Sequence, residues 1–381
     1  MANERPLRLF GVVTESAIEQ ALVDVVRSGA IASGAIIEEF RVALGALLGN
    51  PNVVTTSDVS SAIRSALHLA GIGSGDEVIT APFTCLSTTS PVGLSGAKVV
   101  WADVDPSTGL LDVADLKRCI TSRTKAVMLY HLAGYPGPVE EIARLCADVG
   151  LKLIEDCDNA LGATVGGRLV GSFGDYAAYC FYPNRHLHTL DGGAIACRSA
   201  EDFERAMRLR WFGINLPRFR DGLGEINPDE DVTNLGWGMR LGNIGSAVGL
   251  AQLPGFNARL AKVRENAAAL TALLKGVAGI EVVKPLPGTD PAYWGLLAHV
   301  ANRDEALRRL KTQGVEVSKL HFRNDRYSAF NSDQRPMPGV EKFSASQLFL
   351  PCGWWLERAD IIRMTRLIKN AMLEITAGAT H

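Results

Sequence analysis

The feature that most constrains the fold is the alternation of short apolar runs with helical patterns between Val53 and Cys197. The runs are rich in β-branched residues, and turns containing Gly, Pro or Asp separate them from the helical segments. The expected strands are residues 53–56, 77–80, 98–102, 126–130, 151–155, 176–182 and 194–197. The expected helices between them are residues 60–70, 86–94, 113–120 and 139–149. This order predicts an α/β fold with a mainly parallel seven-stranded sheet, helices on both faces, and ligands at the carboxyl ends of the strands.

The rest of the chain predicts a second, smaller domain. A long helical pattern at residues 257–277 is expected to leave the first domain, and an α+β pattern follows it. The expected elements there are strands 280–283, 294–300 and 315–317 and helices 304–313 and 358–375. We therefore predict a large domain over residues 1–255 and a small C-terminal domain over residues 256–381.

Composition excludes several classes of function. The net charge of the 381 residues is −2, so no bulk basic field predicts binding to nucleic acid or to an anionic membrane. No apolar run approaches the roughly 18 residues of a membrane span. The seven cysteines are scattered without a Cys-x-x-Cys pair, which favours reduced thiols in the cytoplasm and predicts no metal site.

One loop carries an unusual set of side chains. The apolar run from Tyr176 ends at Pro183, and a cationic turn with Arg185, His186 and His188 follows before Asp191-Gly192-Gly193. Arginine is permanently protonated and cannot supply the neutral amine that forms an imine with a carbonyl. Histidine lacks a primary amine but transfers protons near neutral pH.

Motifs along nearly the whole chain resemble those of the DegT/StrS nucleotide-sugar aminotransferases, which have the pyridoxal phosphate (PLP) transferase fold-type I. The motifs are Gly71-Ile-Gly-Ser-Gly-Asp-Glu-Val78 with Ala81-Pro-Phe-Thr84, His131-Leu-Ala-Gly134, Ile154-Glu-Asp-Cys-Asp-Asn-Ala-Leu-Gly162 and Gly171-Ser-Phe-Gly-Asp175. The resemblance implies a homodimer with shared active sites. At the position of the lysine that holds PLP, this sequence has Arg185.

The resemblance also implies a set of cofactor-binding residues. Asp156 matches the aspartate that pairs with the pyridine nitrogen, and Asn159 lies where the family has a ring-side glutamine or histidine. Ser60 and Ser61 begin the helix that receives the cofactor phosphate. Cys85 replaces an aromatic residue that stacks on the ring. The further replacements of the family pattern are Cys180 for a phosphate-binding serine, Val59 for a glycine, and Gly238 for an asparagine of the partner subunit. PLP or pyridoxamine phosphate (PMP) would bind non-covalently, or no cofactor would bind.

The same loop gives the catalytic candidates. His186 is the expected acid/base, with His188 beside it, and Arg185 is expected to bind a phosphate or carboxylate. His321 aligns with a substrate-side histidine of the small domain. Further lining candidates are Tyr182, Tyr135 and His131. The pair Trp354-Trp355 is expected to pack an interface or to stack on a nucleotide base.

Three functions follow from these residues. Phe181-Tyr182-Pro183 and Asp191-Gly192-Gly193 match the loop of the lysine-lacking GDP-4-keto-6-deoxymannose 3-dehydratase branch, which uses PMP and a histidine base. The first histidine of that loop is replaced by Arg185. The second hypothesis is an acid/base enzyme on the same scaffold that acts on a sugar or related metabolite without PLP. The third is a non-catalytic partner of an active aminotransferase.

Overall fold

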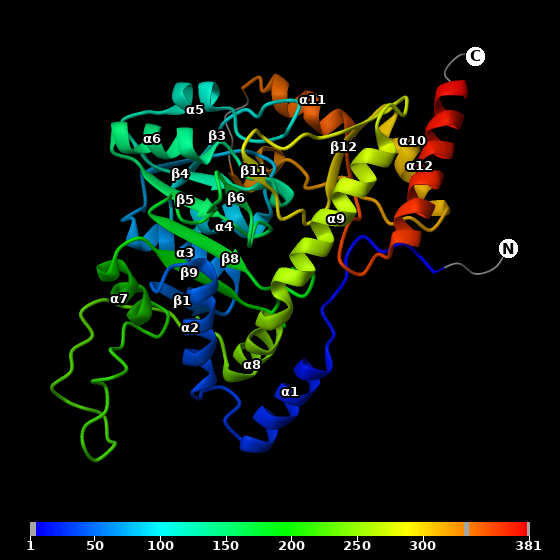
Figure 1. The fold of residues 1–381 in the computed structure, drawn as a ribbon. Helices are drawn as coiled ribbons and strands as arrows, with labels where there is room; N and C mark the ends of the chain where they lie inside the picture. Colours follow the sequence, from blue (N-terminus) through cyan, green and yellow to red (C-terminus); the bar gives the residue numbers. More distant parts are fainter. Residues whose placement is uncertain (1–4, 331–334, 379–381) are drawn as a thin grey trace.

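A seven-stranded sheet forms the centre of the large domain (Figure 1). The computed structural model describes residues 5–330 and 335–378. The strands are β1 (Val53–Thr56), β2 (Glu77–Thr80), β3 (Lys98–Trp101), β4 (Thr124–Tyr130), β5 (Lys152–Asp156), β8 (Tyr176–Cys180) and β9 (Gly193–Cys197). Their order is β1-β9-β8-β5-β4-β2-β3, and only β9 runs against its two neighbours. The predicted mainly parallel sheet of seven strands is therefore confirmed.

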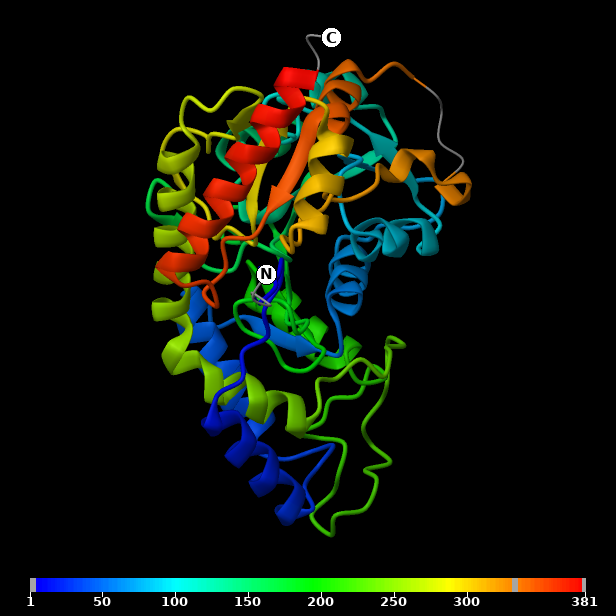
Figure 2. The ribbon, with the colours of Figure 1, turned by 90° about the vertical axis from the view of Figure 1, so that its right-hand side faces the viewer.

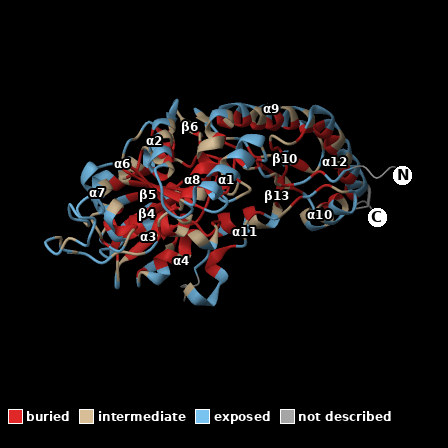
Figure 3. Ribbon diagram, turned by 90° about the horizontal axis from the view of Figure 1, so that it is seen from below, coloured by how far each residue is buried: buried red, intermediate tan, exposed pale blue. Residues whose placement is uncertain are grey.

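Helices cover this sheet on both faces. The helices of this domain are α1 (Ser16–Ser28), α2 (Ile36–Leu48), α3 (Val59–Leu69), α4 (Leu86–Leu94), α5 (Val113–Cys119), α6 (Val139–Val149), α7 (Ala200–Leu209) and α8 (Asn243–Gln252), of which α1 packs on α8. Helix α3 packs on β8 and β9, and α6 packs on β4 and β5. Every residue of β8 and β9 is buried, as expected for strands that are covered on both sides. Figure 3 shows buried residues concentrated around the labelled strands β4 and β5 in the middle of the domain.

The register of the sheet brings six strand ends to one edge. Strands β1, β2, β3, β4, β5 and β8 run in the same direction, because β1 and β8 are both antiparallel to β9. Strand β9 begins at this edge, where Gly193 lies opposite both Thr56 and Cys180. Residues 181–192, which contain the cationic turn, therefore start and end at the carboxyl edge of the sheet.

The C-terminal elements form a second α/β layer, called the small domain here, and most of their buried apolar residues share one core with Leu7. Its sheet is antiparallel in the order β10-β12-β13, formed by β10 (Ile280–Val282), β12 (Leu296–Val300) and β13 (Gln347–Leu350). Its helices are α9 (Phe256–Leu274), α10 (Arg303–Thr312), α11 (Pro338–Ser346) and α12 (Arg358–Gly378). A third sheet joins β11 (Thr289–Asp290), β6 (Thr164–Val165) and β7 (Arg168–Leu169).

Two details of the small domain differ from the sequence prediction. Residues 315–317 form no strand, because Val315 makes only one bridge, to Leu7 of the N-terminal segment. Helix α11 and strand β13 were not predicted. Leu7 lies in the core of the small domain, whereas α1 packs on α8 of the large domain, so residues 7–16 run from one domain to the other (Figure 2).

A long segment without helix or strand connects α7 and α8. Figure 2 shows it extending away from the sheet. In the part of the chain that the structure describes, no helix combines the length and the apolar character needed to cross a membrane.

Candidate functional site

The carboxyl edge of the sheet carries a cluster of buried polar side chains. Tyr130 ends β4, Asp156 ends β5 and Cys180 ends β8, and the loop after β5 adds Asp158 and Asn159. All five residues are buried. Burying a polar group costs free energy unless the group forms hydrogen bonds. The hydrogen-bond partners of these five side chains therefore indicate which groups can react and which can bind a ligand.

Asp158 and Arg185 form the central ion pair of this cluster. Asp158 Oδ1 accepts hydrogen bonds from Arg185 Nε at 3.0 Å and from Nη2 at 2.7 Å. The main-chain oxygen of Asp158 accepts a third bond from Nε at 3.1 Å. Burial disfavours the charge of the guanidinium, but the adjacent Asp158 carboxylate raises the net pKa of Arg185, so the guanidinium stays protonated. The side chain at the expected lysine position is thus a fixed cation.

Trp294 of the small domain covers this ion pair. The guanidinium carbon of Arg185 lies 4.6 Å from the centre of the Trp294 ring. Trp294 Nε1 donates to the main-chain oxygen of Asn184 at 3.0 Å. The indole also stacks on Phe10, with the ring centres 4.6 Å apart and an angle of 21° between the ring planes. Arg185 is therefore held between the large domain and an aromatic residue of the small domain.

Asp156 is fully buried and has both carboxylate oxygens bonded. Thr88 Oγ1 donates to Oδ2 at 2.6 Å, and the main-chain nitrogen of Asp158 donates to Oδ1 at 3.0 Å. Burial, and next the charge of Asp158, raises the pKa of Asp156 to about 7. A carboxyl group with this pKa exchanges protons near neutral pH.

A tyrosine–histidine pair forms the outer part of the site. The Tyr130 hydroxyl donates to Nε2 of His321 at 3.0 Å and accepts a bond from Asn159 Nδ2. The Cys85 thiol lies 3.8 Å from the His321 ring nitrogens. His321 has a φ of 38°, a left-handed conformation that a non-glycine residue adopts at a cost. Burial lowers the pKa of His321 to about 4, so the imidazole is a neutral base at pH 7.

Two buried acceptors of the cluster have no partner. Asp158 Oδ2 and Asn159 Oδ1 are buried oxygen atoms without a hydrogen bond. An unpaired buried acceptor costs about 1–3 kcal/mol, so these atoms are the natural contacts for a donor from a ligand or a water molecule. Hydroxyl groups of a sugar are donors of this kind.

Three donors of the turn after β1 are already bonded to Asp58. Asp58 is the N-cap of α3, and its Oδ1 accepts from the Ser61 main-chain nitrogen at 2.8 Å. Its Oδ2 accepts from the hydroxyls of Ser57 and Ser61, both at 2.8 Å. Ser60 Oγ donates to the main-chain oxygen of Ser87 at 3.3 Å. The predicted phosphate-binding serines are thus bonded to acceptors of the chain itself.

The two loop histidines contact other parts of the molecule. His186 packs edge-on against Trp354 at 5.6 Å. His188 Nε2 bonds to the main-chain oxygen of Val13 at 3.0 Å, and its Nδ1 accepts from the main-chain nitrogen of Leu190 at 3.3 Å. Both rings are buried. The structure therefore places Arg185 in the cluster, whereas His186 and His188 contact residues outside the cluster.

The remaining lining candidates are also engaged elsewhere. His131 Nδ1 accepts from the main-chain nitrogen of Gly137, and Nε2 donates to Glu155 at 3.3 Å. The Tyr135 hydroxyl accepts from the main-chain nitrogen of Leu297. Tyr182 is half exposed. Trp355, which packs on Trp354, donates to the main-chain oxygen of Arg8, so the tryptophan pair holds the N-terminal segment.

His186 gives a prediction for stability against pH. Burial, and then the charges of Arg185 and Arg259, lowers its pKa from 6.5 to about 4. Between pH 6.5 and about pH 4, this histidine binds a proton in the unfolded chain but not in the folded chain. The free energy of unfolding therefore falls as the pH falls through this range. A His186→Phe variant lacks this loss. The unfolding free energy of the variant minus that of wild type should therefore rise by about 2–3 kcal/mol between pH 7.5 and pH 4.5. Urea unfolding at a series of pH values measures this gain, and a difference that does not change with pH would contradict it.

Two other places could hold an ion or a ligand. Ligand atoms of His131, Glu155 and Cys157 lie within 4.8 Å of one another. However, Glu155 accepts three main-chain N–H groups, from Gly171, Phe173 and Gly174, besides the His131 N–H. This cluster is therefore a closed hydrogen-bond network.

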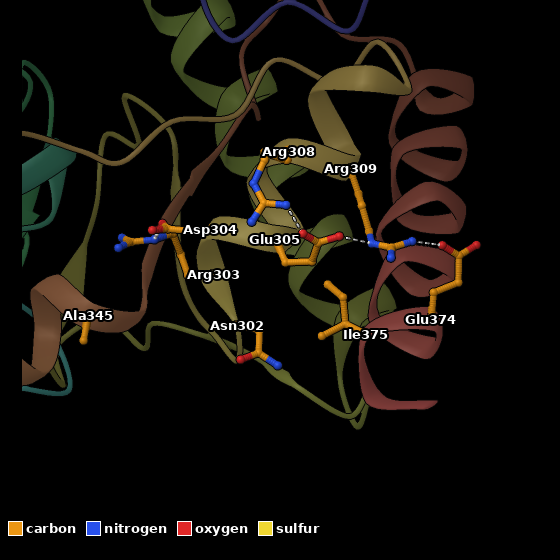
Figure 4. Close-up of a pocket in the computed structure, with 9 residues that line it drawn as sticks. All are labelled: Asn302, Arg303, Asp304, Glu305, Arg308, Arg309, Ala345, Glu374 and Ile375. Carbon is orange, nitrogen blue, oxygen red and sulfur yellow. Dashed lines mark hydrogen bonds and ion pairs between the residues drawn. The ribbon is translucent and has the colours of Figure 1, made fainter. Parts of the chain in front are cut away.

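The second place is a surface groove of about 660 Å³ in the small domain (Figure 4). Its arginines face carboxylates: Arg308 and Arg309 pair with Glu305, and Arg309 also pairs with Glu374. The third arginine, Arg303, pairs with Asp304. These pairs neutralise the groove locally.

Sequence reasoning did not identify three residues of the cluster. Asp158 could have been found, because it follows Asp156 by two positions at a strand end. Tyr130 also ends a predicted strand. Trp294 gives no such signal, since it reaches Arg185 only through the packing of the small domain on the large one.

The residues present do not fit a phosphorylated pyridoxal cofactor. Asp156 is compatible with a pyridine nitrogen, but Arg185 is bonded to Asp158, and Cys85 offers no ring for stacking. At the phosphate position, the carboxylate of Asp58 already accepts three donors of the turn.

Comparison with known proteins places the chain in a family. The model of the DegT/DnrJ/EryC1/StrS aminotransferase family matches residues 13–369. A pleiotropic regulatory protein of Geobacillus stearothermophilus is 30% identical over 342 residues, which is 88% of each chain. A dTDP-3-amino-3,4,6-trideoxy-alpha-D-glucose transaminase of Streptomyces venezuelae is 29% identical over 361 residues, 92% of this chain and 91% of the relative.

Solved structures agree with this assignment. The sugar aminotransferase CalS13 from Micromonospora echinospora has a TM-score of 0.89 and 30% identity, and the match covers 96% of this chain and 99% of CalS13. The expected PLP-dependent transferase fold is thereby confirmed. The chain belongs to the DegT/DnrJ/EryC1/StrS aminotransferase family.

Proposed function

We propose that this protein is a sugar-modifying enzyme that moves a proton at the carbon beside a carbonyl group, using acid/base groups of the chain. The observation that carries the proposal is that the Tyr130–His321 pair and the Arg185–Asp158 pair share one neighbour. The Trp294 ring centre lies 6.4 Å from that of His321 and 4.6 Å from the Arg185 guanidinium carbon. A neutral base beside a fixed cation suits a reaction in which a carbonyl oxygen gains negative charge.

The proposed step uses three side chains. The Tyr130 oxygen takes the proton from the carbon, and the Tyr130 hydroxyl proton passes to His321 Nε2 along the existing 3.0 Å hydrogen bond. The electron pair of the C–H bond moves to the carbonyl oxygen, where an N–H group of Arg185 stabilises the enolate. Return of a proton to the same carbon completes exchange or inversion, and no redox partner is needed.

The substrate class is supported by the family and by the unpaired acceptors. The relatives include a dTDP-aminosugar transaminase and GDP-perosamine synthases, whose names describe nucleotide-linked sugars. The unpaired oxygens of Asp158 and Asn159 match the hydroxyl donors of a sugar ring. We therefore propose a keto-sugar, carried on a nucleotide, as the substrate.

Proton NMR in D₂O tests this proposal. The purified protein is incubated with a dTDP-linked or a GDP-linked 4-keto-6-deoxy sugar. We expect the signal of a proton beside the keto group to disappear faster than in buffer alone. No acceleration with either sugar would reject proton abstraction from this substrate class.

A second candidate is PMP-dependent dehydration, with PMP bound non-covalently. The bonding of Asp156, which would suit a pyridine nitrogen, favours this candidate. Saturable binding of PMP together with loss of water from the sugar would support it. If the protein neither exchanges protons nor binds PMP, a non-catalytic partnership with an active aminotransferase becomes the better explanation.

We also propose a cytoplasmic homodimer. All seven cysteines are free thiols. The long segment between α7 and α8 exposes Leu223, Ile226 and Leu235, at 89%, 59% and 83%. Exposed apolar side chains on one projecting segment are typical of a surface that a second subunit covers.

The dimer proposal gives a prediction for this segment. Changing both Leu223 and Leu235 to Asp should convert the dimer into a monomer, because two charges would be buried without partners. Sedimentation velocity measures the change. Leu373→Asp, at an exposed position on α12 outside this segment, is the control and should remain dimeric. A monomeric wild type, or a dimeric double variant, would contradict the proposal.

A further inference from the structure

We infer that Asp58 is a built-in anion, whose carboxylate takes the position that the phosphate of PLP or PMP would need at the N-terminus of α3. The family resemblance puts the cofactor phosphate at this turn. The chain's own residues there disagree with that expectation, and their contacts explain how.

The carboxylate of Asp58 uses three donors of the turn. A phosphate at a helix N-terminus needs main-chain N–H groups and nearby hydroxyls. Here the Ser61 N–H and the hydroxyls of Ser57 and Ser61 all donate to Asp58 at 2.8 Å. The remaining serine hydroxyl, that of Ser60, donates to Ser87. An incoming phosphate would have to displace a charged acceptor from each of these three donors.

The main chain holds Asp58 in place from both sides. Thr56 Oγ1 donates to the main-chain oxygen of Asp58 at 2.8 Å, and the Ser57 nitrogen donates to Met239 at 2.7 Å. Gly193 of β9 packs so closely that an added Cβ would lie 2.5 Å from the Asp58 oxygen. Two hydrogen bonds and this close packing against β9 therefore fix the position of the turn on the sheet.

A second carboxylate adds to the repulsion. Burial, and to a smaller degree the charge of Asp58, raises the pKa of the neighbouring Asp191. Asp191 lies two residues before Gly193, which packs against the main chain of Asp58. A phosphate dianion at this position would thus meet negative charge from two elements, the turn after β1 and the turn before β9.

The inference concerns binding and does not depend on the proton transfer proposed above. The protein can fail to exchange protons and still lack a phosphate site. It can also exchange protons while binding a phosphate, and in that case only the inference fails.

Calorimetric titration of the full-length protein tests the inference. The probes are PMP, which cannot form an imine with surface lysines, and inorganic phosphate. We expect no saturable binding of either probe by wild type at millimolar concentration. Asp58→Asn keeps the shape and the cap but removes the charge, and Asp58→Ser keeps a hydroxyl cap. Both variants should bind inorganic phosphate at least about tenfold more tightly, which corresponds to about 1.4 kcal/mol.

A matched control separates this position from a general effect of the cap. Asp112 caps α5 by accepting from Ala114 and Asp115, so Asp112→Asn makes the same chemical change elsewhere. It should leave phosphate binding unchanged. Micromolar binding of PMP by wild type would overturn the inference. So would folded Asp58→Asn and Asp58→Ser variants, checked by circular dichroism, that bind phosphate no better than Asp112→Asn.

Discussion

An Arg185→Ala variant is expected to lose about 3–5 kcal/mol of unfolding free energy, because the change leaves a buried carboxylate without its partner. Asp158 is 3% exposed and Arg185 is 9% exposed, so water cannot replace the lost contacts. The loss also includes the stacking of the guanidinium on Trp294, 4.6 Å from the ring centre. Urea unfolding at pH 7.5, followed by circular dichroism, measures the effect.

A double-mutant cycle identifies the source of this loss. The Arg185→Ala/Asp158→Ala variant removes both charges and should be more stable than Arg185→Ala alone. Lys117→Ala is the control for a surface pair, since Lys117 and Glu141 are both about half exposed, and it should cost less than about 1 kcal/mol. An Arg185→Ala loss no larger than that of Lys117→Ala would show that the ion pair does not organise the site.

The second large effect concerns the base. His321→Asn should slow deuterium exchange into the keto-sugar by roughly 10²- to 10⁴-fold, the usual contribution of a positioned acid/base group. Tyr130→Phe should cause a loss of the same order, because it breaks the bond between the phenol and Nε2. His186→Asn, outside the cluster, should change the rate little. If His186→Asn slowed exchange as much as His321→Asn, the base would be His186 of the loop after β8, and the assignment to His321 would be wrong.

The pH dependence of exchange follows from the same residue. The pKa of His321 is lowered to about 4, so its neutral, proton-accepting form predominates at every pH above that value. Acid should therefore reduce exchange only below about pH 5, well under the 6.5 of an ordinary histidine. An acid limb centred near pH 6.5 would point to an exposed histidine as the base.

The large domain could be predicted because its strands are short apolar runs bounded by clear turns. Strand β8 is buried on every residue, and its sequence is continuously apolar or aromatic. The prediction of a strand at residues 315–317 was wrong for the opposite reason. Val315 has the right composition, but its one partner is Leu7, more than 300 residues earlier in the chain. Such pairings are set by tertiary packing and leave no local pattern.

The site could be predicted to the level of its loop and strand ends, and no further. Asp156 and Arg185 could be assigned from their positions relative to β5 and β8. The surroundings of His186 could not be predicted, because neighbours on an irregular turn point in different directions, and its ring packs on Trp354. His321 reaches Tyr130 from the small domain across a sequence separation of 191 residues. Only the packing of the two domains brings this pair together.

The most direct measurement of the central claim is deuterium uptake from D₂O by a nucleotide-linked keto-sugar, followed by mass spectrometry. The protein is dialysed free of small molecules and assayed with and without added PMP. We predict that wild type incorporates deuterium at the same rate with and without PMP. His321→Asn should incorporate deuterium far more slowly than wild type in both cases. Exchange that appears only when PMP is added, or that survives in His321→Asn, would contradict the account.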